Sequence, residues 1–260
     1  MSKRALITGA SGGIGLELAQ IHAANGGDLV LVARSRDKLL RIKSELEQQY
    51  KIKVHVIVQD LTETNAGRAV YDEVKSAGLE IDYLINNAGF GGIGKFNERK
   101  LEEDLAMIQL NVMALVELSH LYVKDFVARG SGKVLQVSST ASLVPGPLQA
   151  TYYATKAFVT SFSNALAEEL SGTRVSVTNL MPGATDTDFG KVSGMDKTKL
   201  FDDVSSAKSV AEDGYKAMMA GDIDKISGLT FSQKVLMKIM PFMPKKMILK
   251  QIRGMQEVKK

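Results

Sequence analysis

Residues 8–15 read TGASGGIG and connect a short apolar run, ALIT (5–8), to a segment with helical spacing. Within such a strand–turn–helix unit, Gly9 permits a tight turn, Gly13 lets the backbone approach a pyrophosphate, and Gly15 allows the helix to pack against the strand. The N-terminus of the helix would then face the phosphates of a dinucleotide. Because the spacing differs from the GxGxxG fingerprint, an ordinary strand-to-helix turn is the alternative for this stretch alone.

Short apolar runs rich in β-branched residues alternate with amphipathic segments along most of the chain. The expected strands are 5–8, 28–33, 53–58, 82–86, 133–138 and 174–180, with 225–231 as a candidate last edge strand. The expected helices are 14–25, 37–50, 63–77, 98–129 and 151–171. This order predicts an α/β fold, a doubly wound, Rossmann-like parallel sheet with helices on both faces. Ligands bind beyond the carboxyl ends of the strands in such a sheet.

With 260 residues, of which 45% are hydrophobic, the chain can bury the core of one large domain. We expect residues 1–230 to form the dinucleotide-binding catalytic domain and residues 231–260 to be a basic helical extension of it. The net charge of +4 is uneven, because residues 231–260 carry eight Lys and Arg against one acid, Glu257. Their apolar residues recur at helical spacing, which favours docking on the domain, a partner subunit or the substrate mouth over binding to anionic lipid.

The composition excludes several kinds of site. The sequence has no cysteine, so disulfides, thiolate zinc sites and a cysteine nucleophile are excluded. The three histidines, His22, His55 and His120, lack the spacing of metal ligands, and we expect no metal site. The N-terminus enters a strand without a long apolar stretch, and no apolar run elsewhere is long enough to span a bilayer. We therefore expect a cytoplasmic protein, with a peripheral membrane position as the alternative, and no nucleic-acid partner.

The end of the second strand bears on the choice of cofactor. An enzyme specific for NAD places an acid there to bind the ribose 2′-hydroxyl, but this sequence reads DLVLVARSR (28–36). An arginine fork suits a 2′-phosphate, so we predict NADP(H) over NAD(H), with Arg34 as the main contact. A solvated loop arginine is the alternative.

The stretch TYYATKAF (151–158) contains two tyrosines and a lysine on a predicted helix. Tyr152 and Lys156 are four residues apart and share a face, whereas Tyr153 points about 100° away. An ammonium near a phenol stabilises the phenolate, so we expect Lys156 to lower the pKa of Tyr152 and make it an acid/base. For this spacing alone, an ordinary helix with an exposed lysine is the alternative.

The strand KVLQVSST ends in two serines at the predicted ligand edge of the sheet. Strand alternation places Ser138 and Ser139 on opposite faces, so that one of them can hydrogen-bond a substrate carbonyl.

Together these motifs resemble those of the short-chain dehydrogenase/reductase superfamily in its compact single-domain form. TGASGGIG resembles the family's TGxxxGxG turn, NNAG (86–89) its strand-four motif, Tyr152 and Lys156 its YxxxK pair, and MPGATDT (181–187) its PGxxxT motif. The family serine lies thirteen residues before the tyrosine, which is Ser139 here, and Asn111 matches the helical asparagine of its tetrad.

The resemblance implies roles for these residues. Tyr152 would be the general acid in reduction, Lys156 would lower its pKa and bind the nicotinamide ribose, Ser139 would orient the carbonyl, and Asn111 would hold a water beside the lysine. For Asn87, a purely structural role in pinning the central strands is an equal alternative. The expected cofactor contacts are Gly9, Ser11, Gly13, Ile14, Gly15, Arg34, Asp60, Leu61, Asn87, Ala88, Gly89, Tyr152, Lys156, Pro182, Gly183, Thr185 and Thr187.

Two functions from different classes follow. The first is an NADP(H)-dependent oxidoreductase that transfers hydride between the cofactor and a ketone, aldehyde or secondary alcohol, acting as a homodimer or homotetramer. Residues 184–204 lack a clear period and are expected to form a lid, which with the apolar tail hints at an apolar substrate. The alternative is a dinucleotide-binding sensor or scaffold whose tail binds a membrane or partner. A pure binder has no chemical need for a proton relay, so the tetrad favours the enzyme.

Overall fold

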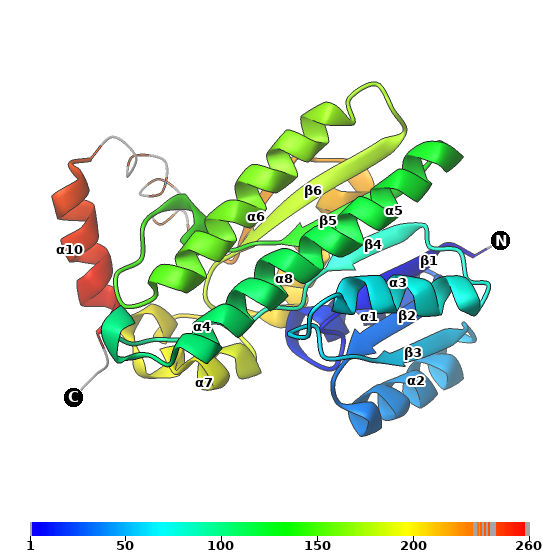
Figure 1. The fold of residues 1–260 in the computed structure, drawn as a ribbon, viewed down its shortest axis with the longest axis horizontal. Coiled ribbons are helices and arrows are strands. Elements are labelled where there is room, and N and C mark those ends of the chain that lie inside the picture. Colours follow the sequence, from blue (N-terminus) through cyan, green and yellow to red (C-terminus); the bar gives the residue numbers. More distant parts are fainter. Residues whose placement is uncertain are drawn as a thin grey trace.

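A computed structural model describes residues 2–230, 233, 235, 237, 239 and 243–257 (Figure 1). Its centre is a seven-stranded sheet in the order β3-β2-β1-β4-β5-β6-β9, in which every neighbouring pair is parallel. The strands are β1 (Arg4–Thr8), β2 (Asp28–Ala33), β3 (Val54–Val58), β4 (Tyr83–Asn86), β5 (Gly132–Val137), β6 (Val175–Pro182) and β9 (Asp224–Ser227). A short two-stranded pair, β7 (Thr185–Asp186) and β8 (Ser205–Ser206), lies apart from this sheet.

Helices cover both faces of the sheet, as predicted (Figure 1). One core contains side chains of α1 (Gly13–Ala24), α2 (Arg36–Tyr50) and α8 (Ala207–Ala220). The other contains side chains of α3 (Ala66–Ser76), α5 (Leu115–Arg129) and α6 (Ala150–Glu169). Every residue of β2 is buried, which is typical of a parallel sheet covered on both sides.

The strand order reverses between β1 and β4, because the chain builds outward from β1 through β2 to β3 and then returns to the other side of β1. Crevices at such a reversal are where doubly wound folds bind ligands. The carboxyl ends of β1 and β4 carry the glycine turn and the NNAG segment, so the topology brings these two motifs together.

The six expected strands are confirmed, and the candidate edge strand is β9, which is shorter than predicted. Two expectations about helices need correction. Helix α8 was not predicted, although Ser206 caps its start and Gly221 ends it. The single helix expected over 98–129 begins at α4 (Leu101–Ile108) and passes through a π-helical turn, Gln109–Ala114, before α5.

Helices α4 and α5 together are apolar enough to pass a length-and-composition test for a membrane span, Leu101–Arg129, contrary to the sequence-based expectation that no segment would. This is weak evidence, since core helices satisfy the same test. Tyr122 and Phe126 of α5 are fully buried in the core beside the sheet, which accounts for much of the apolar character of α5.

The predicted basic extension, 231–260, lies partly outside the described residues. Its described helix, α10 (Lys245–Gln256), packs at the end of the molecule near α7 (Asp188–Ser193) and the start of α6 (Figure 1). Ile248 and Ile252 are buried there in a third apolar cluster, with Tyr152 and Tyr153.

Candidate functional site

A cavity of about 610 Å³ opens at the carboxyl ends of the central strands, a volume within the range of ligand sites. The predicted residues that line it are Gly9, Ser11, Gly13, Ile14, Arg34, Asp60, Leu61, Asn87, Ala88, Gly89, Ser139, Tyr152, Lys156, Pro182, Gly183, Thr185 and Thr187. Gly15 and Asn111 were also predicted, but they lie behind the wall and do not line it. The fold thus gathers residues from seven separate segments of sequence around one space.

The glycine turn at one end of the cavity is held by close backbone contacts. Gly9 has a φ of +67°, and a Cβ there would lie 2.9 Å from the Cα of Ala88. A Cβ on Gly15 would lie 2.4 Å from the Gly9 carbonyl oxygen, so Gly15 serves helix packing rather than ligand contact. A Cβ on Gly12 would meet nothing within 4 Å, which leaves the start of α1 open to the cavity.

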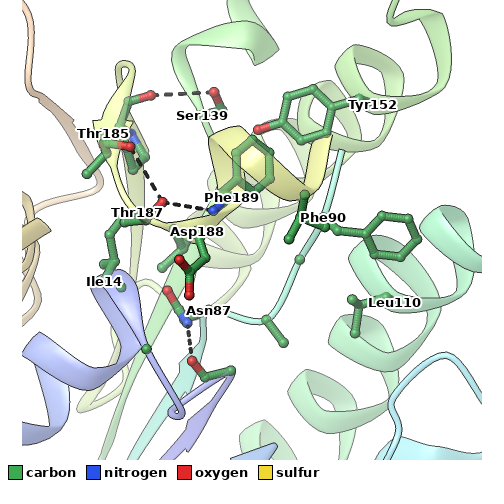
Figure 2. Close-up of a pocket in the computed structure, with 18 of the residues that line it drawn as sticks. Ile14, Asn87, Phe90, Leu110, Ser139, Tyr152, Thr185, Thr187, Asp188 and Phe189 are labelled. Atoms are coloured by element: carbon green, nitrogen blue, oxygen red, sulfur yellow. Dashed lines mark hydrogen bonds between the residues drawn. The ribbon is translucent and has the colours of Figure 1, made fainter. Parts of the chain in front are cut away.

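Asn87 joins the ends of β1 and β4. Its Nδ2 donates to the carbonyl oxygens of Thr8, at 2.9 Å, and Gly9, at 3.3 Å, and its backbone N–H donates to the Thr8 hydroxyl (Figure 2). These bonds support the structural role that was the alternative for this residue, although the side chain also borders the cavity.

The wall of the cavity formed by the residues that follow β2 carries positively charged side chains. Arg34 is exposed, and its Nη1 lies 3.9 Å from Oδ2 of Asp60. The other carboxylate oxygen of Asp60 accepts from the backbone N–H and the hydroxyl of Thr62, which fixes the carboxylate locally. Lys38, on the first turns of α2, also lines this part of the cavity. Lys38 was not predicted, although it lies four residues after Arg34 and a helical register places the two on the same side.

Tyr152 and Lys156 lie on the same face of α6, as predicted, and both are almost completely buried. The Lys156 Nζ lies 6.0 Å from the centre of the Tyr152 ring and donates to the Val137 carbonyl oxygen at 2.9 Å. Tyr152 points toward the side chain of Ser139 (Figure 2), a neighbour that favours the ionised form of the phenol.

The expectation that Lys156 lowers the pKa of Tyr152 is wrong for this structure. Burial raises that pKa, and the Ser139 side chain opposes this shift only in part. Burial also lowers the pKa of Lys156 to about 8. The physical reason is that removing both groups from water disfavours their charged forms.

The two serines that follow β5 point in different directions, as strand alternation predicts. The Ser138 hydroxyl turns away, donating to the Lys156 carbonyl oxygen at 2.9 Å and contacting the Thr160 hydroxyl at 2.8 Å. Ser139 faces the cavity, where its Oγ accepts from Ala141 N–H and donates to the Pro182 carbonyl oxygen at 3.4 Å (Figure 2). Ser139 is therefore the serine available beside Tyr152.

Asn111 lies on the π-helical turn and is buried. Its Oδ1 accepts from the Phe90 N–H at 3.1 Å, and its Nδ2 donates to the Phe90 carbonyl oxygen and to the Thr155 hydroxyl. A Cβ on Gly89 would lie 3.1 Å from Oδ1 and 3.3 Å from the Lys156 Nζ, so the three residues are adjacent. Asn111 thus fixes the segment that follows NNAG.

The remaining end of the cavity is apolar. Residues 184–204, expected as a lid, form β7, α7 and two 3-10 turns, and they contribute side chains that line the space. The Phe189 ring lies 5.5 Å from the Tyr152 ring, centre to centre (Figure 2). Tyr153 also lines the cavity, although helical geometry pointed it away from Tyr152. The apolar and aromatic lining residues that were not predicted include Phe90, Leu110, Tyr153, Phe189, Met195 and Phe201.

These walls fit a nicotinamide dinucleotide. The open start of α1 at Gly12 offers backbone N–H groups for a pyrophosphate, and Arg34 and Lys38 offer positive charge at the adenosine end. Lys156, buried at the other end, can reach a ribose hydroxyl. Within the described ranges, no group of three or more His, Asp or Glu could hold a metal ion.

Known proteins resemble this chain in sequence and in fold. The sequence profile described as short chain dehydrogenase matches residues 3–198. The human very-long-chain 3-oxoacyl-CoA reductase is 34% identical over 196 residues, which are 72% of this chain and 61% of that protein. Human 17-beta-hydroxysteroid dehydrogenase type 3 is 34% identical over 74% of this chain and 62% of its own length. The chain therefore matches less than two thirds of either relative.

Among solved structures, the short-chain dehydrogenase from Sphingobium yanoikuyae in complex with NADPH is 29% identical, with a TM-score of 0.82 over 94% of this chain and 97% of that one. The sequence match and the shared fold agree with the arrangement of the glycine turn, the serine and the YxxxK pair. The chain belongs to the short-chain dehydrogenase/reductase family, whose members are oxidoreductases that bind a nicotinamide cofactor.

Proposed function

We propose that the chain reduces ketones or aldehydes with NADPH, or catalyses the reverse oxidation of secondary alcohols, with Tyr152 as the proton donor and acceptor. One observation carries this proposal. Tyr152 and Ser139 line the same cavity as the glycine turn and the apolar side chains, and the Tyr152 hydroxyl points toward Ser139 (Figure 2). A carbonyl carbon held there would meet the hydride that NADPH supplies when bound.

Ser139 and Tyr152 bind the carbonyl oxygen in this proposal. Both hydroxyls reach the same part of the cavity, so both can donate to one oxygen and polarise the carbonyl bond (Figure 2). The proton on the Tyr152 Oη then moves to the carbonyl oxygen. Because burial raises the pKa of Tyr152, the phenol stays protonated at neutral pH, which suits the donor needed for reduction.

Lys156 supports the tyrosine from behind. Its Nζ is fixed by the Val137 carbonyl oxygen and can bind a ribose hydroxyl while its positive charge favours the phenolate left after proton transfer. Phe189 and Met195 exclude water from the reacting centre, which strengthens these electrostatic interactions.

The preference for NADP(H) rests on charge. Arg34 and Lys38 line the cavity where β2 ends, and no acidic residue occupies the position after Ala33 that would bind a free 2′-hydroxyl. The solved relative in complex with NADPH supports the same choice.

An apolar carbonyl compound is the proposed substrate class. Aromatic and aliphatic side chains form the end of the cavity beyond Tyr152, and the names of the two human relatives refer to very-long-chain acyl and steroid compounds. Hydrophobic surfaces of this kind favour the carbon-rich part of a ligand.

A homodimer or homotetramer in the cytoplasm is proposed as the assembly. Leu101, Leu105 and Met113 on α4 and the π-helical turn, with Phe158 on α6, are large apolar residues that are exposed in the single chain. Burial of such residues in an interface would remove them from water. Light scattering during gel filtration measures the assembly directly.

The test of the proposed reaction measures NADPH consumption with a panel of ketones and aldehydes. Tyr152→Phe should lower kcat by about 10²- to 10⁴-fold, the usual contribution of a general acid, while the Kd for NADPH changes little. Tyr50→Phe, at a tyrosine outside the cavity, is the matched control. Equal turnover by the Tyr152→Phe and wild-type proteins would show that another group supplies the proton.

A further inference from the structure

Helix α10 packs against the apolar end of the cavity. Ile248 and Ile252 of this helix are 6% and 4% exposed and belong to the same cluster as Tyr152, Tyr153 and Met195. The 3-10 turn Lys199–Phe201 of the lid also contacts α10. The helix therefore lies behind both the catalytic end of α6 and the lid, as its position in Figure 1 shows.

A buried hydrogen bond connects α10 to the cavity wall. The Gln256 Nε2 donates to the Tyr153 hydroxyl at 2.6 Å, and Gln256 is fully buried. The Tyr153 ring lines the cavity and meets the Tyr152 ring edge to face, with centres 6.0 Å apart. A side chain next to the proposed proton donor is thus positioned by a residue about a hundred positions later in the sequence.

Tyr153 has little freedom on its other side. A Cβ on Gly146 would lie 2.2 Å from the Tyr153 ring, so the ring already occupies the space over that glycine. Burial raises the pKa of its hydroxyl to about 12, which keeps it neutral and able to accept from Gln256. With the ring fixed between Gly146 and Gln256, the position of α10 determines where this part of the wall lies.

We propose that α10 closes the apolar end of the cavity, and that Gln256, acting through Tyr153, makes the enzyme selective for carbonyl compounds with a large apolar part. This inference rests on the proposed reductase function. A small ketone needs only Ser139 and Tyr152 to bind. A long or bulky ketone must also bury its apolar part in the apolar end of the cavity. If α10 is displaced, water enters that end, and each methylene that is no longer buried weakens binding about fourfold.

The family match supports a role for α10 in selectivity rather than in the common chemistry. The matched region ends at residue 198, before both α10 and the 3-10 turn that α10 contacts. The serine, tyrosine and lysine proposed for the chemistry lie inside the match, whereas α10 lies outside it.

The test compares Gln256→Leu with Gln251→Leu, a matched change at an exposed position of the same helix. Steady-state kinetics with NADPH are measured for cyclohexanone and for 2-decanone. Gln256→Leu should raise the KM for 2-decanone about tenfold or more, since it removes a buried hydrogen bond and loosens the wall. The KM for cyclohexanone, kcat and the Kd for NADPH should change less than about threefold. Tyr153→Phe, which removes the same bond from the other side, should shift the ratio in the same direction.

A readout independent of turnover separates this inference from the reductase proposal. Amide hydrogen exchange over residues 188–201 should be faster in Gln256→Leu than in Gln251→Leu, with no difference over residues 9–24. Absence of turnover with every ketone, together with absence of NADPH binding, contradicts the proposed function alone. Equal exchange over 188–201 in the two variants, or an unchanged ratio of the two KM values, overturns the role of α10.

Discussion

The Lys156 ammonium lies 6.0 Å from the centre of the Tyr152 ring and is fixed by the Val137 carbonyl oxygen, in a position where both side chains are nearly inaccessible to water. The positive charge of Lys156 therefore does not bring the pKa of the Tyr152 phenol below its ordinary value. Burial keeps the phenol protonated and makes the ammonium easier to deprotonate. In the proposed reaction, the proton therefore stays on the tyrosine until a substrate oxygen accepts it.

Lys156 should give stability a specific pH dependence. Its folded-state pKa of about 8 lies below the ordinary 10.5, so between these values the unfolded chain binds more protons and stability rises with pH. The buried charge costs on the order of 3 kcal/mol below pH 8 and progressively less up to pH 10.5. In urea unfolding, the wild type should gain stability relative to Lys156→Met as the pH rises from about 7.5 to about 10.

Tyr152 does not disturb this comparison. Its pKa is raised above the ordinary value of 10, so above pH 10 the folded state retains the Tyr152 proton longer than the unfolded state and stability falls with pH. The wild type and Lys156→Met both contain Tyr152, so this contribution is common to the two proteins. A stability difference between wild type and Lys156→Met that stays flat over the same pH range would mean that Lys156 is not titrating as a buried group.

Gly15 and Gly12 should respond differently to alanine. A Cβ on Gly15 would lie 2.4 Å from the Gly9 carbonyl oxygen and from the Asn87 Nδ2, so Gly15→Ala should lower the free energy of unfolding by about 1–3 kcal/mol despite the better helix propensity of alanine. Gly12→Ala meets nothing within 4 Å and should leave stability within about 0.5 kcal/mol.

The same two variants separate folding from binding. Gly12 lines the cavity, so its new methyl group would enter the space proposed for the pyrophosphate and should weaken NADPH binding, as measured by fluorescence titration. Gly15→Ala should affect binding only through stability. The assignment of the two glycines would be reversed if Gly12→Ala were the destabilised variant.

The sheet and the shared helix face of Tyr152 and Lys156 were predictable from sequence because they depend on local patterns. Segments such as 29–33 are continuous apolar runs, and the YxxxK spacing defines a helix face by itself. The π-helical turn at 109–114 was not predictable, since it coincides with bonds from Asn111 to Phe90, which is distant in sequence.

The protonation of the site was predicted wrongly for a related reason. Burial of Tyr152 comes from segments that show no period in the sequence or lie far from it, such as α7 with Phe189, whose ring contacts Tyr152, and α10 with Ile252, which belongs to the same apolar cluster. A motif identifies which side chains are neighbours on one helix. It does not indicate how much water the rest of the fold removes from them, and this burial is the main cause of the pKa shift of each group.

Arg34 and Lys38 should determine the preference for NADPH over NADH. Removal of either cation, in Arg34→Ala or Lys38→Ala, should raise the Kd for NADPH about tenfold, since a charge-assisted contact with the 2′-phosphate is lost at an exposed position. The Kd for NADH should be nearly unchanged. Arg36→Ala is the control, because Arg36 is exposed and lies outside the cavity lining. Equal weakening of both cofactors would place these side chains away from the 2′ position.

Asn111 should act mainly by fixing the segment after NNAG. All three of its hydrogen bonds go to protein groups, two of them to the backbone of Phe90, and the residue is 1% exposed. Asn111→Leu leaves the Phe90 N–H and carbonyl oxygen without these partners and should lower the free energy of unfolding by about 2–4 kcal/mol. Gln109→Leu, on the same π-helical turn but bonded at the surface to Glu63, should cost less than about 0.5 kcal/mol.

Hydrogen exchange distinguishes this positioning role from a direct part in proton transfer. If Asn111 fixes Phe90, the amides of 89–94 should exchange faster in Asn111→Leu than in Gln109→Leu, and activity should fall because Phe90 and Gly89 border the cavity beside Lys156. If the residue instead serves proton transfer alone, turnover should fall while exchange at 89–94 stays as in the control. The three bonds to Phe90 and Thr155 favour the first result, since a side chain whose oxygen and nitrogen are both engaged by protein groups is held as a structural link.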